Sequence, residues 1–204
     1  MLFSDSFFTV SRPSEGIYKD RGSKFLAFVF PVKTTQEIKE KLEYLKKEHP
    51  SAVHHCYAWR LGADKNAFRT NDDGEPSGTA GKPIYSQILS NDLTNILIVV
   101  VRYFGGSLLG VPGLIQAYKS AAADALAKNE IVEQHILEEY SISFGEEDIS
   151  RVMSLLKSHE AQIVSQSYDT QHLLVYRVKK QLALALEEKL KALYKTKLSY
   201  LQTI

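Results

Sequence analysis

Three carboxylates and three glycines lie close together in the segment NDDGEPSGTAGKP, residues 71–83, which we call the acidic loop. The segment has neither the period of a helix nor that of a strand, so we predict a loop of fixed shape. Asp72, Asp73 and Glu75 could ligate Mg²⁺, because hard cations prefer oxygen ligands. Alternatively, the two aspartates cap turns with their side chains. We favour the alternative, since short acidic turns are far commoner than metal-binding loops.

A second segment that could bind a ligand is NILIVVVRYFGGSLLGVPGL, residues 95–114. Its β-branched run predicts a buried strand that leads through two glycines into a helix. The backbone N–H groups of Gly105, Gly106 and Gly110 could bind a phosphate at the start of that helix. A tight connection with positive φ angles, or close packing against the acidic loop, explains the same glycines. Both interpretations stay open, and neither a Walker A nor a dinucleotide-binding motif is present.

Two arginines border these segments. Arg69 leads into the acidic loop, and Arg102 ends the apolar strand. Both could bind phosphate, or both could pair with the carboxylates of the loop and hold its shape. We favour the structural role, because the carboxylates outnumber the two arginines locally.

His54 and Cys56 lie on one face of a strand predicted at residues 53–61. A thiol and an imidazole suggest nucleophilic chemistry, but residues two apart on a strand lie too far from each other for a direct hydrogen bond. No third group that would orient them is evident. A packed cysteine and a hydrogen-bonded histidine are therefore the favoured interpretation.

Our central prediction is that the acidic loop folds back onto the Phe-Gly-Gly corner, so that two distant segments form one exposed surface. The residues that we expect to bind a ligand there are His54, Arg69, Asp72, Asp73, Glu75, Ser77, Thr79, Lys82, Arg102, Gly105, Gly106 and Gly110.

Composition limits the class of protein. Hydrophobic residues at 44% and charged residues at 24% are ordinary values for a globular chain of 204 residues. The net charge of +1 argues against nucleic-acid binding through overall charge. The single cysteine excludes an internal disulfide and a multi-cysteine zinc site. No signal peptide or membrane-spanning run is evident, so we expect a soluble cytoplasmic protein without a cofactor.

The pattern of elements predicts an α+β fold with two domains, residues 1–132 and 133–204. In the first, strand-like runs at 15–32, 53–61 and 95–103 are separated by helices. One helix starts at a capping box of Thr34 and Glu37, a short one starts at Pro83, and a third runs from Pro112 to Asn129.

The ends of the first domain are less regular. An apolar patch in residues 1–14 could add an edge strand or fray. Residues 130–134 are polar, and the hydrophobic pattern starts afresh after them. The second domain then has the order β-α-β-β-α-β, which fits a ferredoxin-like unit.

Several motifs resemble the IMPACT family, and in particular its bacterial YigZ-type branch. They are RGSKF at 21–25, HHCYAWRLG at 54–62, NDDGEPSGTAGKPI at 71–84 and VVVRYFGGSLLGVPGLIQAY at 99–118. The resemblance covers nearly the whole chain. It implies a first domain like domain 2 of ribosomal protein S5, and a ferredoxin-like second domain similar to the last domain of elongation factor G.

This chain departs from the family pattern at two positions. The family commonly has a lysine where this chain has Leu108 and a glycine where it has Pro112. Loss of the lysine removes a cation beside the glycine turn, which weakens the case for phosphate binding there.

The resemblance also implies a role. Eukaryotic relatives bind the ribosome-associated activator of the amino-acid-starvation kinase and so relieve repression of translational initiation. We therefore expect a noncatalytic, translation-linked regulatory protein that binds RNA, the ribosome or a ribosome-associated partner. One alternative is a metal-assisted phosphoryl-transfer or hydrolytic enzyme in which Lys82 or Arg102 stabilises charge. The other is a module that binds only protein.

Overall fold

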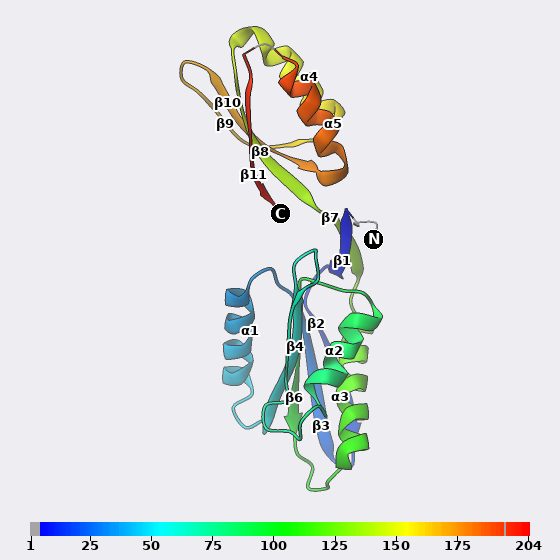
Figure 1. Cartoon of the computed structure of the whole chain (residues 1–204). Coiled ribbons are helices and arrows are strands. Elements are labelled where there is room, and N and C mark those ends of the chain that lie inside the picture. The colour runs from blue at the N-terminus through cyan, green and yellow to red at the C-terminus, as the bar shows by residue number, and fades with distance from the viewer. Residues whose placement is uncertain (1–4, 194) are drawn as a thin grey trace. The chain divides into compact units, whose positions relative to one another are not determined.

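The computed structural model describes residues 5–193 and 195–204, which form two compact units (Figure 1). Phe7–Gln134 make up the first unit, and His135–Ile204 together with Asp5 and Ser6 belong to the second. In the described part of the chain, no helix is both long and apolar enough to cross a membrane.

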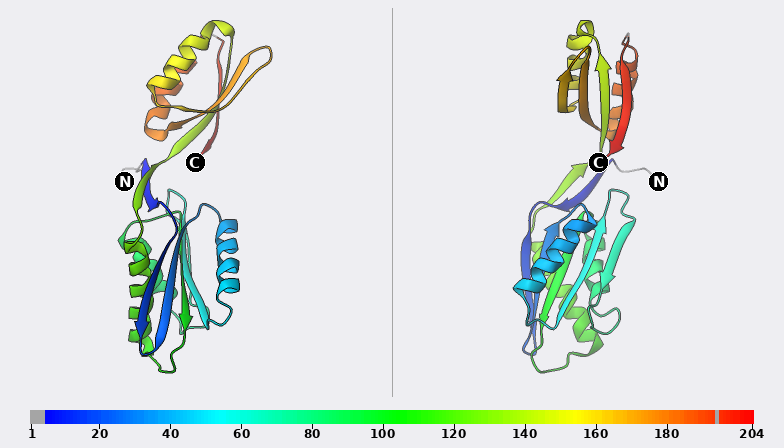
Figure 2. Two further views of the ribbon diagram at one scale, coloured as in Figure 1. Left: turned by 180° about the vertical axis from the view of Figure 1, so that it is seen from behind. Right: turned by 90° about the vertical axis from the view of Figure 1, so that its left-hand side faces the viewer.

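The first unit is built on a five-stranded antiparallel sheet with the strand order β2-β3-β6-β4-β5. Helix α1 covers one face of this sheet, and α2 and α3 cover the other (Figures 1 and 2). The elements are β1 Ser6–Val10, β2 Ser14–Asp20, β3 Ser23–Pro31, α1 Thr35–Glu48, β4 His54–Leu61, β5 Ala67–Asn71, α2 Gly81–Ser90, β6 Ile96–Tyr103, α3 Gly110–Ala127 and β7 Ile131–His135.

The central strand β6 is buried on both faces, as its continuous apolar run predicts. Ile96, Ile98 and Val100 pack in the core beneath α2 and α3. Leu97 and Val99 alternate with them and pack in the core beneath α1. Because successive side chains of a strand point to opposite faces, a strand covered on both sides has to be apolar throughout.

The helix start that we predicted at Thr34 and Glu37 is confirmed, although Glu37 bonds to the backbone N–H of Lys33 and not to that of the N-cap residue Thr34. Thr34 Oγ1 accepts a hydrogen bond from Glu37 N at 3.1 Å, and Glu37 Oε2 accepts one from Lys33 N at 2.7 Å. These two bonds satisfy backbone donors that have no partner within the helix, so the local sequence fixes where α1 begins.

Three features of the first unit go beyond the sequence analysis or differ from it. Residues 130–134 were recognised only as a polar stretch after which the hydrophobic pattern starts afresh, but residues 131–134 belong to β7, which pairs with β1 in a two-stranded sheet. Strand β5 was not predicted, because its exposed edge position gives it no periodic burial. Helices α2 and α3 each begin two residues before the prolines that were expected to start them, at Gly81 and Gly110.

The second unit has the predicted order β-α-β-β-α-β. Its antiparallel sheet has the strand order β11-β8-β10-β9, which is that of a ferredoxin-like unit. Helices α4 and α5 cover one face of the sheet and share its core. The elements are β8 Leu137–Phe144, the short 3₁₀ helix η1 Glu146–Asp148, α4 Ile149–Ser158, β9 Gln162–Tyr168, β10 His172–Lys179, α5 Lys180–Lys191 and β11 Lys197–Thr203.

His55 on β4 makes the stability of the first unit depend on pH. Its side chain is buried, and in the described part of the chain its Nε2 has no hydrogen-bond partner. Burial lowers the pKa of His55, and the opposite effect of the Asp73 carboxylate does not cancel this. The unfolded chain binds a proton here below a pH of about 6.5, whereas the folded chain resists it. The folded state therefore loses stability as the pH falls below that value.

We expect the free energy of unfolding to fall more steeply between about pH 7 and pH 5 in the wild type than in a His55→Gln variant, which cannot titrate at this position. Urea denaturation at a series of pH values measures this difference. Parallel pH profiles for the two proteins would contradict the assignment.

Candidate functional site

Asp72 closes the acidic loop with its side chain. Its Oδ1 accepts hydrogen bonds from Ala80 N at 3.0 Å and Gly81 N at 2.8 Å, and its Oδ2 accepts one from Gly78 N at 2.8 Å. Burial alone raises the pKa of Asp72, but the N–H groups of Gly78, Gly81 and Ala80 outweigh it, so the pKa lies below its usual value. The turn-capping interpretation of Asp72 is confirmed, and its carboxylate serves the loop and the start of α2.

Asp73 fastens the loop to β4. Its Oδ2 accepts a hydrogen bond from His55 N at 2.7 Å, and its backbone oxygen lies 2.6 Å from His54 Nδ1. A carbonyl oxygen can only accept, so Nδ1 of His54 carries the proton. The Asp73 backbone has a φ of 41°, in the left-handed region that aspartate tolerates better than most residues.

Glu75 turns inward from the loop and pairs with Arg102 at the end of β6. Its Oε1 lies 2.5 Å from Arg102 Nη1 and also accepts a hydrogen bond from Tyr118 on α3 at 2.8 Å. Both charged side chains are almost fully buried. The predicted contact between the acidic loop and the Arg102 end of β6 is therefore confirmed, with Glu75 as the carboxylate that makes it.

The network continues to Cys56, whose Sγ donates to the Asp72 carbonyl at 3.0 Å and lies 3.3 Å from the Tyr118 hydroxyl. Burial raises the pKa of both Cys56 and Tyr118 far above their ordinary values. A thiol needs its thiolate form to act as a nucleophile, so Cys56 is a packed structural residue here.

A pocket of about 390 Å³ lies beside the Glu75–Arg102 pair, and we call it the Arg102 pocket. Four large apolar side chains from different segments of the chain meet at its rim, and all four are exposed to solvent. They are Val53, Phe104, Leu108 and Val111. The complete lining consists of Val53, His54, Glu75, Pro76, Arg102, Phe104, Leu108, Leu109, Gly110, Val111 and Leu114.

The guanidinium of Arg102 lies between two aromatic rings. Its central carbon is 5.4 Å from the ring centre of Phe25 and 5.5 Å from that of Phe104, which is within the range of cation–π attraction. His54 Nε2 lies 3.9 Å from Glu75 Oε1 at the pocket wall. The pocket thus combines an apolar mouth with an internally neutralised ion pair.

The three glycines of the corner have different surroundings. Phe104 and Gly110 line the same pocket as Glu75 and Pro76, as our central prediction requires, whereas Gly105 packs on another segment. Gly105 N donates to Ser23 Oγ at 3.1 Å, so this N–H does not face a phosphate. A Cβ on Gly105 would lie 2.0 Å from the Gly22 carbonyl carbon, so this glycine packs on the turn between β2 and β3. Gly106 and Gly110 have φ angles of 87° and 71°, and Gly110 also lines the pocket. The tight connection therefore explains the glycines better than phosphate binding does.

Four further predicted residues lie away from the pocket lining. Arg69 is exposed on β5, and in the described part of the chain it forms no ion pair with a carboxylate, so its expected structural pairing was wrong. Ser77 and Lys82 are exposed. Thr79 is buried, and its hydroxyl donates to the Pro76 carbonyl at 2.7 Å. Their part in binding stays a prediction.

The carboxylates of the loop do not converge on one point. Asp72 binds backbone N–H groups, Asp73 binds β4 and Glu75 binds Arg102. Within residues 5–193 and 195–204, no group of three or more His, Cys, Asp or Glu side chains is arranged to hold a metal ion. The donor set therefore does not fit the magnesium site that we considered.

Sequence reasoning missed the hydroxyl of Tyr118 and the apolar rim. A tyrosine on the buried face of a helix needs a hydrogen-bond partner, and that requirement could have pointed to Tyr118. Leu108 drew attention only as the place of a lost lysine, yet 84% of it is exposed and it lines the pocket. The leucine makes this part of the rim apolar, where the family resemblance led us to expect a cation.

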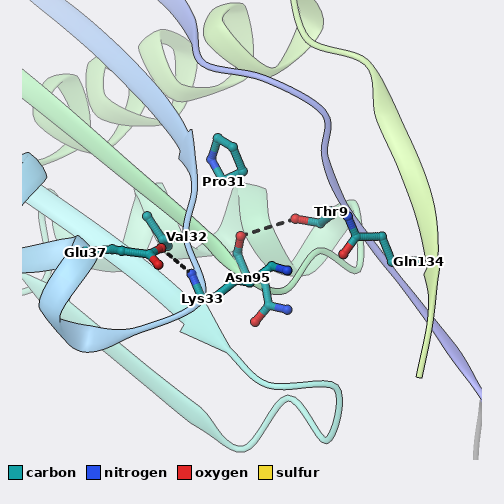
Figure 3. A pocket seen from close by; sticks show the side chains of 7 residues that line it. All are labelled: Thr9, Pro31, Val32, Lys33, Glu37, Asn95 and Gln134. Atoms are coloured by element: carbon teal, nitrogen blue, oxygen red, sulfur yellow. Dashed lines mark hydrogen bonds between the residues drawn. The ribbon is translucent and has the colours of Figure 1, made fainter. Parts of the chain in front are cut away.

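A smaller pocket of about 210 Å³ lies near the start of α1 (Figure 3). Two of its polar contacts are internal, because Thr9 Oγ1 donates to the Asn95 carbonyl and Lys33 N donates to Glu37. Its lining consists of Thr9, Pro31, Val32, Lys33, Glu37, Asn95 and Gln134, none of which we had predicted as a site residue.

The motifs that build the Arg102 pocket lie within a known family domain. Residues 21–126 match the Impact N-terminal domain. The chain belongs to the IMPACT family. The matched residues include His54, the acidic loop, Arg102 and Tyr118, so every polar side chain of the network is part of the family domain.

Two bacterial family members illustrate the relationship. The IMPACT family member YigZ of Escherichia coli is 33% identical over 80% of this chain and 81% of its own length. The family member YvyE of Bacillus subtilis is 38% identical over 65% of this chain and 61% of its own length. A crystal structure of a protein described as hypothetical is 29% identical, covers 98% of both chains and has a TM-score of 0.75.

Proposed function

We propose that this IMPACT-family chain is a noncatalytic regulatory protein that acts in translation and binds a protein partner through the Arg102 pocket. The link to translation rests on family membership, because the family resemblance implies a role of this kind. The preference for a protein partner rests on the pocket itself.

The observation that carries the proposal is the apolar rim of Val53, Phe104, Leu108 and Val111 around a buried ion pair. Nucleic-acid binding depends on cations that are free to contact phosphates. The one arginine among the described lining residues is already neutralised by Glu75. Exposed apolar and aromatic side chains around a pocket are typical of the centre of a protein interface.

An enzyme that uses a metal is a weaker candidate. Such an enzyme needs carboxylates with free oxygens that point to a common centre. The oxygens of Asp72 are engaged by three backbone N–H groups, and Glu75 is bound to Arg102 and Tyr118.

A Leu108→Asp substitution tests the proposal. It places a carboxylate in the apolar rim and should weaken binding to ribosomes at least about tenfold, a loss of about 1.4 kcal/mol of binding free energy. Co-sedimentation of the purified protein with ribosomes measures the bound fraction. Leu184→Asp is the matched control, because 73% of Leu184 is exposed on α5, outside the pocket lining.

Two outcomes would refute the proposal. One is equal sedimentation of the wild type and Leu108→Asp. The other is tight binding of the wild type to protein-free ribosomal RNA, with the same affinity in the Leu108→Asp variant. That result would assign the interaction to RNA.

A further inference from the structure

A groove of about 540 Å³ lies between α4 and α5 on the second unit. We call it the α4–α5 groove. It is independent of the Arg102 pocket, since all of its lining residues belong to the second unit. They are Ser150, Arg151, Ser154, Leu155, Lys189, Ala192 and Leu193.

Small side chains keep the groove open. Ser150 and Ser154 are four residues apart on α4 and so lie on one side of that helix, and Ala192 lines the opposite wall. None of the three reaches far enough to fill the space between the helices. Leu155 and Leu193 line the groove from below, because both pack against the core of the unit. The groove therefore has an apolar floor that the fold itself leaves partly uncovered.

The charges along the groove are cationic. Lys189 Nζ lies 3.2 Å from His159 Nε2, and the described residues contain no carboxylate that pairs with Lys189. His159 Nδ1 lies 2.8 Å from the Leu155 carbonyl, which can only accept a hydrogen bond, so Nδ1 carries a proton and Nε2 can accept from the lysine. The His159 imidazole thus positions Lys189 without neutralising its positive charge.

Arg151 adds a second cation. Its Nη1 lies 3.7 Å from Asp148 Oδ1, and 74% of its side chain is exposed. One separated contact leaves most of the five guanidinium donors available. Asp148 does not line the groove, and the described lining residues include neither aspartate nor glutamate.

We propose that the α4–α5 groove binds an acidic segment of a partner protein, with one or two bulky apolar side chains on the leucine floor and carboxylates on Arg151 and Lys189. Charge complementarity identifies the occupant, because an acidic peptide meets Lys189, which pairs with no carboxylate of the described residues, and Arg151, whose one contact with Asp148 leaves most of its side chain exposed. An amphipathic helix laid in an apolar groove is a recurring form of such recognition. The described lining residues offer no aromatic ring on which a nucleic-acid base could stack.

Fluorescence anisotropy with the full-length chain tests this proposal. The probe is a labelled amphipathic peptide of leucine and glutamate at helical spacing, and the matched probe carries lysine in place of glutamate. We expect the acidic probe to bind at least about tenfold more tightly than the basic one, with an affinity that falls as salt is raised.

Three variants locate the binding. Lys189→Glu should weaken binding of the acidic probe at least about tenfold, because it reverses a charge at the groove wall. Ala192→Trp should weaken it as well, since the ring would fill the groove without changing the charge. Lys157→Glu is the control for charge, because Lys157 is exposed on α4 and does not line the groove.

Thermal unfolding followed by circular dichroism confirms that each variant is folded before binding is measured. Equal affinity for the two probes, or equal losses in Lys189→Glu and Lys157→Glu, would overturn the proposal. Stronger binding to vesicles of anionic phospholipid than to the acidic probe would also overturn it, because the occupant would then be a lipid surface.

Discussion

Replacing Arg102 with alanine should lower the free energy of unfolding by about 3–5 kcal/mol, because it leaves the buried Glu75 carboxylate without its cation. Among the described residues, only the Tyr118 hydroxyl, 2.8 Å from Glu75 Oε1, would still donate a hydrogen bond to that carboxylate. The cation–π contacts with Phe25 and Phe104 would be lost as well. Chemical denaturation of the wild type and the variant measures the difference.

An exposed ion pair provides the control for Arg102→Ala. Lys128 Nζ lies 2.7 Å from Asp124 Oδ2, and both side chains are substantially exposed. Lys128→Ala should therefore cost no more than about 0.5 kcal/mol. The double variant Glu75→Leu with Arg102→Met should recover much of the loss, since an apolar pair can replace a buried ion pair. A stable Arg102→Ala protein that no longer binds ribosomes would contradict the structural role and make Arg102 a ligand-binding residue instead.

The second large effect is expected at Asp72. Replacement by alanine should lower the free energy of unfolding by about 3 kcal/mol. Each hydrogen bond to a charged acceptor contributes about 1.5–3 kcal/mol, but water can bind some of the N–H groups that lose their acceptor. The three N–H groups concerned belong to Gly78, Ala80 and Gly81, so the loop and the start of α2 should loosen together. Hydrogen exchange of these amides, measured beside chemical denaturation, reports the local loss.

The effect of Asp72 should depend on pH. The pKa of Asp72 in the folded chain lies below its ordinary value, so the unfolded chain takes up the proton first as the pH falls. The stability that Asp72 contributes is complete well above a pH of about 3.9 and is lost below it. The difference between the wild type and Asp72→Ala should therefore shrink in acid.

The neighbouring aspartate serves as the control for Asp72. Its Oδ2 accepts one backbone hydrogen bond, from His55 N, so Asp73→Asn, which keeps a side chain suited to the positive φ at this position, should lower the free energy of unfolding clearly less than Asp72→Asn does. An equal loss of unfolding free energy in the two variants would show that the negative charge of the loop stabilises the fold and that the individual hydrogen bonds do not.

These bonds explain why the loop is acidic although its carboxylates do not converge on a metal. Asp72 shapes the loop, Asp73 attaches it to β4, and Glu75 reaches across to β6 and α3. The wall of the Arg102 pocket formed by Glu75 and Pro76 depends on all three. If the pocket binds a protein partner, substitutions at Asp72 and Asp73 should affect that binding through the position of Glu75.

The amino-acid sequence by itself determined the elements that depend on local patterns. The N-cap hydrogen bond of Thr34 fixed the start of α1, and the uninterrupted apolar run fixed β6 as a strand covered on both faces. Periodicity alone also predicted the ferredoxin-like order of the second unit. In each case the decisive interactions join residues close in the chain, or depend only on which positions are apolar.

Only the tertiary structure decided which of several equivalent partners would meet. Three carboxylates and two arginines allow several pairings, and Glu75 with Arg102, 27 residues apart, was selected because β4 and β6 are neighbours in the sheet. The same holds for β7, whose polar sequence becomes a strand because β1 lies beside it. It holds also for Leu108, which becomes part of an apolar rim only because the fold brings Val53 and Phe104 next to it. Contacts of this kind depend on how the chain packs, and local sequence patterns do not specify them.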